Sequence, residues 1–181
     1  MPDTPPFLKS KRVLAKQNQF GIPATSEGRQ PVAFVEGRGV MLKDVEGREY
    51  LDCFGGYSAV NLGHCNPEVV RAIQDQVAKL WHVSWDYYNL PITHLQEKLA
   101  GLYPGRLKKT IFSACGAEAV ETAVKLAKKY AHMKGHPSTG LVSLTCSFHG
   151  RTATAMSLTG QSKYKIGLTG YPSPGVVQAP A

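Results

Sequence analysis

The stretch from Lys109 to Ala119 constrains the fold of this chain more than any other. A short apolar run at residues 111–114 predicts a buried strand, and Gly116 is followed by apolar residues at helical spacing up to Ala131. A strand, a glycine turn and a helix in this order direct the unpaired N–H groups of the first helical turn towards an anion. Because Gly116 has no Cβ, a phosphate group could approach the backbone there. The stretch therefore predicts a phosphate-binding turn.

Size and charge limit the class of protein. The chain has 181 residues and 43% hydrophobic residues, which is enough for a packed core and argues against disorder. Its net charge of +8, from 21 basic and 13 acidic residues, raises the possibility of a nucleic-acid surface. However, the lysines are scattered along the expected helix faces, and no RNA-binding aromatic signature accompanies them. We therefore expect no nucleic-acid partner.

The cysteines and the apolar segments exclude other classes. The four cysteines have no CxxC spacing, so neither a zinc site nor a redox pair is indicated. The N-terminus lacks a long apolar segment, and no stretch is apolar enough to cross a membrane. We expect a cytoplasmic protein with reduced thiols, no metal and no membrane partner.

The chain order suggests three segments. Residues 1–30 read as a flexible N-terminal arm with a short helix over 9–18. Residues 31–55 alternate short apolar runs with Gly-bearing turns, which predicts a small antiparallel meander that cannot hold a core alone. Residues 56–181 read as part of a larger α/β domain, with helices starting at Asn66 and near Pro91.

The second half of the chain predicts a parallel sheet. A second apolar strand at 141–145 follows the helix that starts at Gly116, and a short helical pattern then runs through Met156 and Leu158. Strand, helix and strand at this spacing indicate a βαβ unit. Ligands bind such sheets at the carboxyl ends of the strands, where both Gly116 and Phe148 fall. The tail after Gly160 is rich in Gly and Pro.

Four blocks in a fixed order carry a more specific resemblance. They are residues 44–52 (DVEGREYLD), 63–67 (GHCNP), 116–119 (GAEA) and 148–152 (FHGRT). With them, residues 32–164 resemble the N-terminal part of class III aminotransferases, which include ornithine, acetylornithine and 4-aminobutyrate aminotransferases. These are pyridoxal-phosphate enzymes of fold type I. The resemblance implies an α/β fold made of a small antiparallel meander and an incomplete large domain.

The resemblance implies the cofactor-binding residues. Gly116 and Ala117 match the two residues whose backbone amides hold the phosphate of pyridoxal 5'-phosphate. Ala114 and Cys115 replace the usual Asn and Ser, so fewer side-chain donors would reach the phosphate. Phe148 matches the aromatic residue that stacks on the pyridine ring, and its alternative role is a core aromatic. His149 matches a residue that flanks the ring, and its alternative role is a turn residue.

The resemblance also implies two substrate-binding residues. Arg151 matches an arginine that grips a substrate carboxylate, for which a planar guanidinium suits two parallel hydrogen bonds. Its alternative is a surface charge. Tyr57 lies in a Tyr-Ser-Ala-Val-Asn run similar to that of ornithine aminotransferases, which favours a basic or ω-amino donor. The alternative is that the Tyr57 side chain only packs against its neighbours. His64 is expected to shape its loop and not to be catalytic.

The implied reaction transfers an amino group from an ω-amino or basic amino acid, of the ornithine, acetylornithine or 4-aminobutyrate type, to a 2-oxo acid. The implied assembly is a homodimer. In the family the Schiff-base lysine and the carboxylate that pairs with the pyridinium nitrogen come later, and Lys163 and Lys165 lie too early to match. We therefore expect an N-terminal fragment that contains no catalytic residue and is inactive alone. The alternatives are a racemase or aminomutase, or a non-catalytic fragment that binds a phosphate ligand or a partner subunit.

Overall fold

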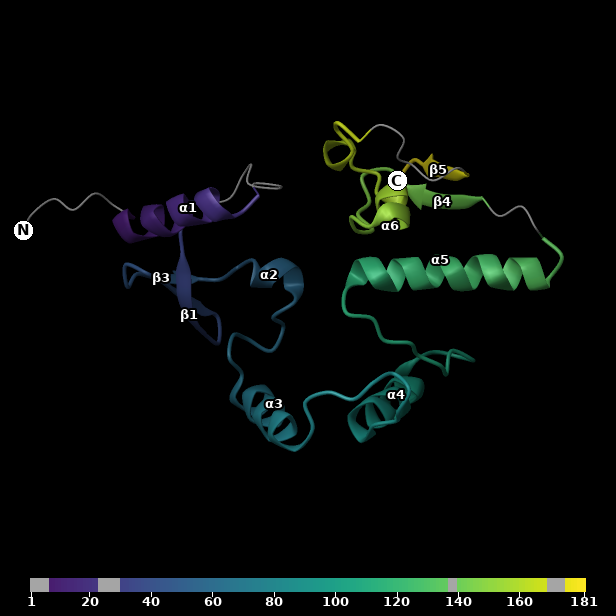
Figure 1. The fold of residues 1–181 in the computed structure, drawn as a ribbon, viewed down its shortest axis with the longest axis horizontal. Coiled ribbons are helices and arrows are strands. Elements are labelled where there is room, and N and C mark those ends of the chain that lie inside the picture. Colours follow the sequence, from purple (N-terminus) through teal and green to yellow (C-terminus); the bar gives the residue numbers. More distant parts are fainter. Residues whose placement is uncertain (1–6, 23–29, 137–139, 169–174) are drawn as a thin grey trace, which may run out of the picture. The chain divides into compact units, whose positions relative to one another are not determined.

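The computed structural model describes residues 7–22, 30–136, 140–168 and 175–181. They belong to two compact units, residues 1–87 and residues 88–181 (Figure 1). The sequence predicted a domain boundary near residue 56, and that boundary stays a prediction. Parts of the predicted arm, residues 1–6 and 23–29, lie outside the described residues.

The first unit contains the predicted meander. Three antiparallel strands pair in the order β1-β2-β3, and their bounds are β1 (Phe34–Arg38), β2 (Met41–Asp44) and β3 (Glu49–Leu51). Gly39 and Gly47 stand between the strands with φ of +57° and +91°. Because such backbone angles disfavour residues with a Cβ, these glycines allow the tight connections that the sequence predicted.

Helix α1 (Leu8–Phe20) includes the helix predicted over 9–18 and is fixed to the meander through Ser10. The Ser10 N–H and hydroxyl donate to the two carboxylate oxygens of Glu46, at 2.8 and 2.7 Å, and Ala33 N–H donates to Ser10 Oγ at 3.2 Å. Burial raises the pKa of Glu46, but the bonds from Ser10 outweigh it and hold that pKa below its ordinary value. The described part of the arm is thus tied to the meander by a charged acceptor.

Two further helices start where the sequence predicts. Helix α3 (Pro67–Lys79) belongs to the first unit, and its cap Asn66 accepts from the N–H groups of Glu68 and Val69. Helix α4 (Leu90–Leu102) belongs to the second unit, and its cap Asn89 accepts from Ile92 N–H at 3.1 Å. Both helices have a proline in the first turn, where its missing N–H costs nothing.

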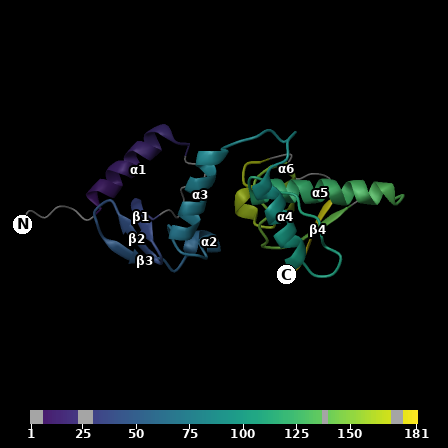
Figure 2. The same cartoon turned by 90° about the horizontal axis from the view of Figure 1, so that it is seen from below.

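The second unit is built on helix α5 (Gly116–Met133) and a parallel pair of strands, β4 (Leu141–Leu144) and β5 (Val176–Ala179). Between the strands come helix α6 (Ala153–Leu158) and the short turn η1 (Ser162–Tyr164). Helix α6 packs against α5 and both strands, as Figures 1 and 2 show. The core lies in this helix, because Ala155, Met156 and Leu158 are the buried apolar residues among those described.

The prediction of a strand at residues 111–114 is wrong. No strand is formed there, Ile111 is 53% exposed, and the described residues include no backbone hydrogen bond to Ile111, Phe112 or Ser113. A strand needs a neighbour to pair with, and β4 pairs with β5 instead. The predicted parallel sheet is confirmed, but its second strand is β5, in the Gly- and Pro-rich tail for which no strand was named. The βαβ unit is therefore β4, α6 and β5.

The described residues include no helix that is both long enough and apolar enough to cross a lipid bilayer.

Candidate functional site

The predicted phosphate turn has the donors that an anion requires. Helix α5 begins at Gly116, its cap residue Cys115 is extended, and no side chain caps the helix start. The first hydrogen bond of the helix runs from Ala119 N–H to Cys115 O at 3.1 Å. The N–H groups of Gly116, Ala117 and Glu118 therefore have no acceptor within the helix. A Cβ added to Gly116 would meet nothing within 4 Å, so the space beside this residue is open.

Glu118 shapes the approach to this turn. Its Oε2 accepts a hydrogen bond from Ala114 N–H at 2.9 Å, which folds the entering chain back against the first helical turn. Beside the turn lies an open pocket of about 450 Å³, and its lining residues are Phe112, Ser113, Ala114, Glu118, Glu121, Thr122 and Lys125. Gly116 and Ala117 are not among the residues that line this pocket.

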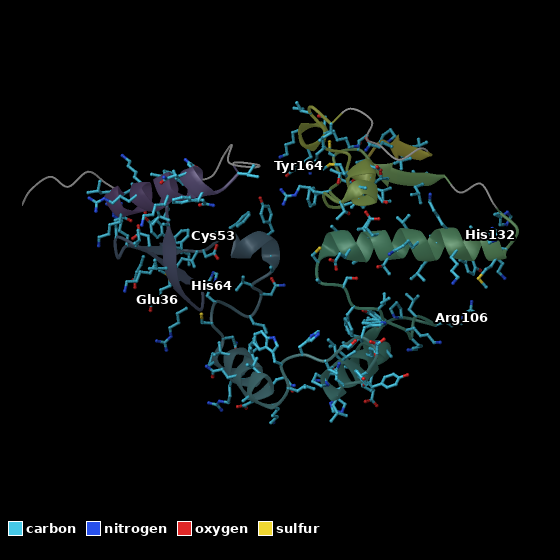
Figure 3. The ribbon with its side chains drawn as sticks, in the orientation of Figure 1. Glu36, Cys53, His64, Arg106, His132 and Tyr164 are labelled. Carbon is cyan, nitrogen blue, oxygen red and sulfur yellow. The ribbon has the colours of Figure 1, made fainter. Side chains whose placement is uncertain are left out.

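Phe148 follows β4 with its ring half exposed. Its exposed fraction among the described residues is 52%. The ring centroid lies 5.3 Å from that of Tyr164, with the two planes tilted by 58°. Tyr164, labelled in Figure 3, comes from η1. The aromatic ring is thus steadied by one neighbour and keeps surface available for a flat ligand.

His149 is held by its backbone and by its ring. Its N–H donates to Thr159 Oγ1 at 3.0 Å, and its ring Nδ1 lies 3.3 Å from the hydroxyl of Ser147. The ring is half-buried. These two contacts fix the orientation of the imidazole in the loop beside Phe148.

Gly150 brings the Phe148 loop and the phosphate turn together. Its φ is +124°, and a Cβ added there would lie 2.6 Å from Ala117 Cβ and 3.1 Å from Ala155 Cβ. Only glycine fits between these side chains at this backbone angle. Ala117 and Gly150 are therefore in direct contact, which joins two of the four sequence blocks.

Two residues that hold this arrangement were missed by sequence reasoning. Thr159 is fully buried, and its Oγ1 accepts from His149 N–H and lies 3.0 Å from the carbonyl oxygens of Gly150 and Ala155. Glu121, on α5, accepts from the start of α6 through its Oε1. Its partners are more than thirty residues away along the chain, so no local pattern could have indicated them.

Arg151 is exposed and has no hydrogen-bond or ion-pair partner among the described residues. Its guanidinium is therefore available to a ligand.

Tyr57 lies on an unusual turn in the first unit, whereas the other five predicted site residues belong to the second unit. Helix α2 (Gly55–Ser58) is a left-handed turn, with φ between +56° and +62° at all four residues. Tyr57 is 87% exposed, and its ring meets the Phe54 ring edge-on at 4.4 Å. A left-handed backbone conformation costs about 1–2 kcal/mol for a residue with a Cβ. Other contacts must therefore stabilise the exposed position of the Tyr57 side chain.

Asp52 and His64 anchor that turn. Asp52 Oδ1 accepts from Phe54 N–H and Gly55 N–H, and Asp52 Oδ2 lies 2.6 Å from His64 Nε2 (Figure 3 labels His64). The hydrogen bond with His64, and then the two backbone donors, lower the pKa of Asp52. His64 also pairs through its backbone with Gly39. This is the loop-shaping role expected of His64.

Within the described residues, no three His, Cys, Asp or Glu side chains lie close enough together to hold a metal ion.

Comparison with known proteins identifies the family. A model of the family described as aminotransferase class-III matches residues 23–181. The chain is 42% identical over 168 residues to a probable 4-aminobutyrate aminotransferase of Bacillus subtilis, covering 91% of this chain and 37% of the relative. It is 39% identical over 171 residues to an ornithine aminotransferase of Halalkalibacterium halodurans, covering 93% of this chain and 42% of the relative.

Solved structures agree with this result. An (S)-enantioselective omega-transaminase from Thermomicrobium roseum superposes with a TM-score of 0.85 at 33% identity, covering 94% of this chain and 40% of that chain. An omega transaminase from Pseudomonas jessenii in complex with PMP gives 0.83 at 26% identity, covering 92% of this chain and 38% of that chain.

The chain belongs to the class III aminotransferases, a family of pyridoxal-phosphate-dependent enzymes. The α/β fold expected from the sequence, the N-terminal part of the fold type I architecture, is confirmed. The chain spans 37 to 42% of the length of the two relatives described above.

Proposed function

We propose that this chain supplies the phosphate- and ring-binding loops of a transaminase that moves an amino group from an ω-amino or basic amino acid to a 2-oxo acid. The contact between Ala117 and Gly150 carries the proposal, because it joins an uncapped helix start to a loop with a half-exposed aromatic ring. The ornithine and 4-aminobutyrate aminotransferases among the relatives support this class of donor.

The residues present fit pyridoxal 5'-phosphate. The N–H groups of Gly116 and Ala117 would donate to its phosphate, Phe148 would stack on its ring, and His149 would flank the ring. When bound, the cofactor supplies an electron sink for charge that develops on the substrate. Arg151 would bind a substrate carboxylate through its two-pronged guanidinium, and Tyr57 would donate to or accept from the polar end of the donor.

We further propose that the chain by itself binds the cofactor without turnover, because it contains no residue that matches the Schiff-base lysine of the family. The working enzyme would be a cytoplasmic homodimer whose sites form at the subunit interface, as the family implies.

Fluorescence titration with pyridoxamine 5'-phosphate tests the proposal. This ligand has no aldehyde, so it cannot react with surface lysines. The chain should bind it at least about tenfold more tightly than pyridoxamine, which lacks the phosphate. Equal affinity for the two ligands, or no binding, would contradict the proposal. Competition by inorganic phosphate with no preference for the pyridine ring would favour the alternative of a simple phosphate-binding fragment.

Substitutions at two glycines provide a test variant and its matched control. Gly116→Ala should weaken binding of pyridoxamine 5'-phosphate, because the new methyl group enters the open space beside the donors. Gly101, in α4, also has open space around its Cβ position, so Gly101→Ala should leave binding unchanged.

A further inference from the structure

We propose that Glu121 is a positioning residue, which fastens the loop at residues 148–152 to helix α5 and thereby determines how tightly the ring of the cofactor is held. This inference rests on the proposed function. The proposed role of Glu121 affects binding of the cofactor ring, whereas the open N–H groups at the start of α5 would bind the cofactor phosphate.

The contacts of Glu121 converge on the point where the loop becomes helix α6. Oε1 of Glu121 accepts from the hydroxyl of Thr152 at 2.7 Å, from Thr154 N–H at 2.9 Å and from Ala155 N–H at 3.4 Å. Thr152 is the cap residue of α6, yet its side chain makes no capping bond of its own. The start of α6 is therefore capped by a carboxylate from α5, where a negative charge is favourable.

The loop has a second anchor on its other side. Thr159 Oγ1 accepts from His149 N–H and lies 3.0 Å from Gly150 O, while Gly150 itself lies against Ala117. Between the two anchors the backbone of residues 149–152 is fixed relative to α5, which also carries the phosphate donors. Removal of Glu121 releases the Thr152 end of the loop and leaves the Thr159 end attached.

Glu121 acts through the loop and not directly on a ligand of the phosphate turn. It lines the pocket beside the turn, and neither Gly116 nor Ala117 lines that pocket. Loss of its carboxylate should therefore alter the position of Phe148 and His149 while the N–H groups of Gly116 and Ala117 keep their geometry. A residue with only a structural role would affect ring binding and phosphate binding alike.

The test compares two ligands on the same variants. We expect Glu121→Ala to weaken binding of pyridoxamine 5'-phosphate about tenfold, and to change the affinity for inorganic phosphate, measured by displacement, by less than about twofold. Glu121→Gln keeps an acceptor oxygen in place and should recover most of the loss. Glu97→Ala, on α4, removes a carboxylate that has no partner among the described residues and should change neither affinity.

Amide hydrogen exchange gives a readout that needs no ligand. The amides of Thr154 and Ala155 should exchange faster in Glu121→Ala, with no change at the amides of α4. If Glu121→Ala does not fold, Thr152→Val, which removes only the hydroxyl donor, carries the same comparison, and it should weaken binding of pyridoxamine 5'-phosphate more than binding of inorganic phosphate.

The outcomes separate the two proposals. Equal weakening of both ligands, or unchanged binding of pyridoxamine 5'-phosphate in Glu121→Ala, would overturn the positioning role and leave the proposed function intact. Failure of the unmodified chain to bind pyridoxamine 5'-phosphate would overturn the proposed function, and the positioning role with it.

Discussion

Gly150 lies so close to Ala117 that a methyl group on Gly150 would be 2.6 Å from the Ala117 Cβ. The first of these residues belongs to the loop after β4 and the second to the first turn of α5. No side chain larger than hydrogen can occupy position 150 unless one of these two segments moves. The separation between the predicted ring-binding and phosphate-binding residues therefore depends on this glycine.

Replacement of Gly150 should be costly. Gly150→Ala combines a methyl clash with a φ of +124°, and we expect it to lower the free energy of unfolding by about 2–4 kcal/mol. Gly101→Ala is the control, since this helical glycine has open space around it and alanine favours the helix by up to about 1 kcal/mol. Urea unfolding of both variants measures the difference. Equal stability of the two would mean that the loop moves away from α5 without cost.

The capping bond of Glu121 should depend on pH. The hydrogen bond from Thr152, with those from Thr154 and Ala155, holds the pKa of Glu121 below its ordinary value of 4.5 despite opposing burial. A carboxyl group whose pKa is lowered on folding contributes stability above the unfolded-state pKa, and this contribution is lost as pH falls through the folded-state value. Protection of the Thr154 and Ala155 amides should be constant from pH 7 to about 5 and decrease below that range.

Other carboxyl groups titrate in the same range, so a difference measurement is required. In Glu121→Gln the side chain does not ionise, and the protection of these two amides should lose its dependence on pH. The same acid-induced decrease in both proteins would assign the effect to another group.

The attachment of α1 to the meander is a second electrostatic feature. Ser10 is 2% exposed and donates twice to Glu46, so Glu46→Ala should release α1 and accelerate tryptic cleavage after Lys9, Lys11 and Arg12. Glu36→Ala is the matched control, because Glu36 makes only an exposed ion pair with Lys43 at 3.5 Å. Unchanged cleavage in Glu46→Ala would show that other contacts fix the helix.

Local signals were enough to predict several elements. The start of α3 was predicted from Asn66 and Pro67, and that of α4 from Pro91, because an asparagine cap or a proline in the first turn satisfies the helix start without tertiary contacts. The turn at Gly116 could be predicted for a similar reason, since the donors of a helix start are local. The position of the candidate phosphate turn could thus be derived from a few neighbouring residues.

Features that depend on distant residues could not be predicted. Residues 111–114 have an apolar strand pattern, but a strand forms only with a partner, and β5 pairs with β4 instead. The role of Glu121 depends on hydrogen bonds to residues more than thirty positions away along the chain. Thr159 contacts residues four to ten positions away, but only the folded loop shows which groups its hydroxyl meets. The left-handed turn under Tyr57 has no pattern beyond its two glycines. The sequence therefore suggested candidate site residues, but not the long-range contacts that hold them.

The two-stranded sheet leaves one apolar face uncovered by the described residues. Val142 is 72% exposed, Val177, its partner in the parallel register, is 63% exposed, and Leu144 is 52% exposed, whereas Ser143 on the opposite face is buried. Because an exposed apolar sheet favours association, the chain alone should self-associate, and Val142→Lys with Val177→Lys should reduce this. Ile22→Lys, which removes an exposed apolar side chain outside the sheet, is the control. Light scattering across a concentration series measures the effect, and a monodisperse, cooperatively melting monomer would contradict the prediction.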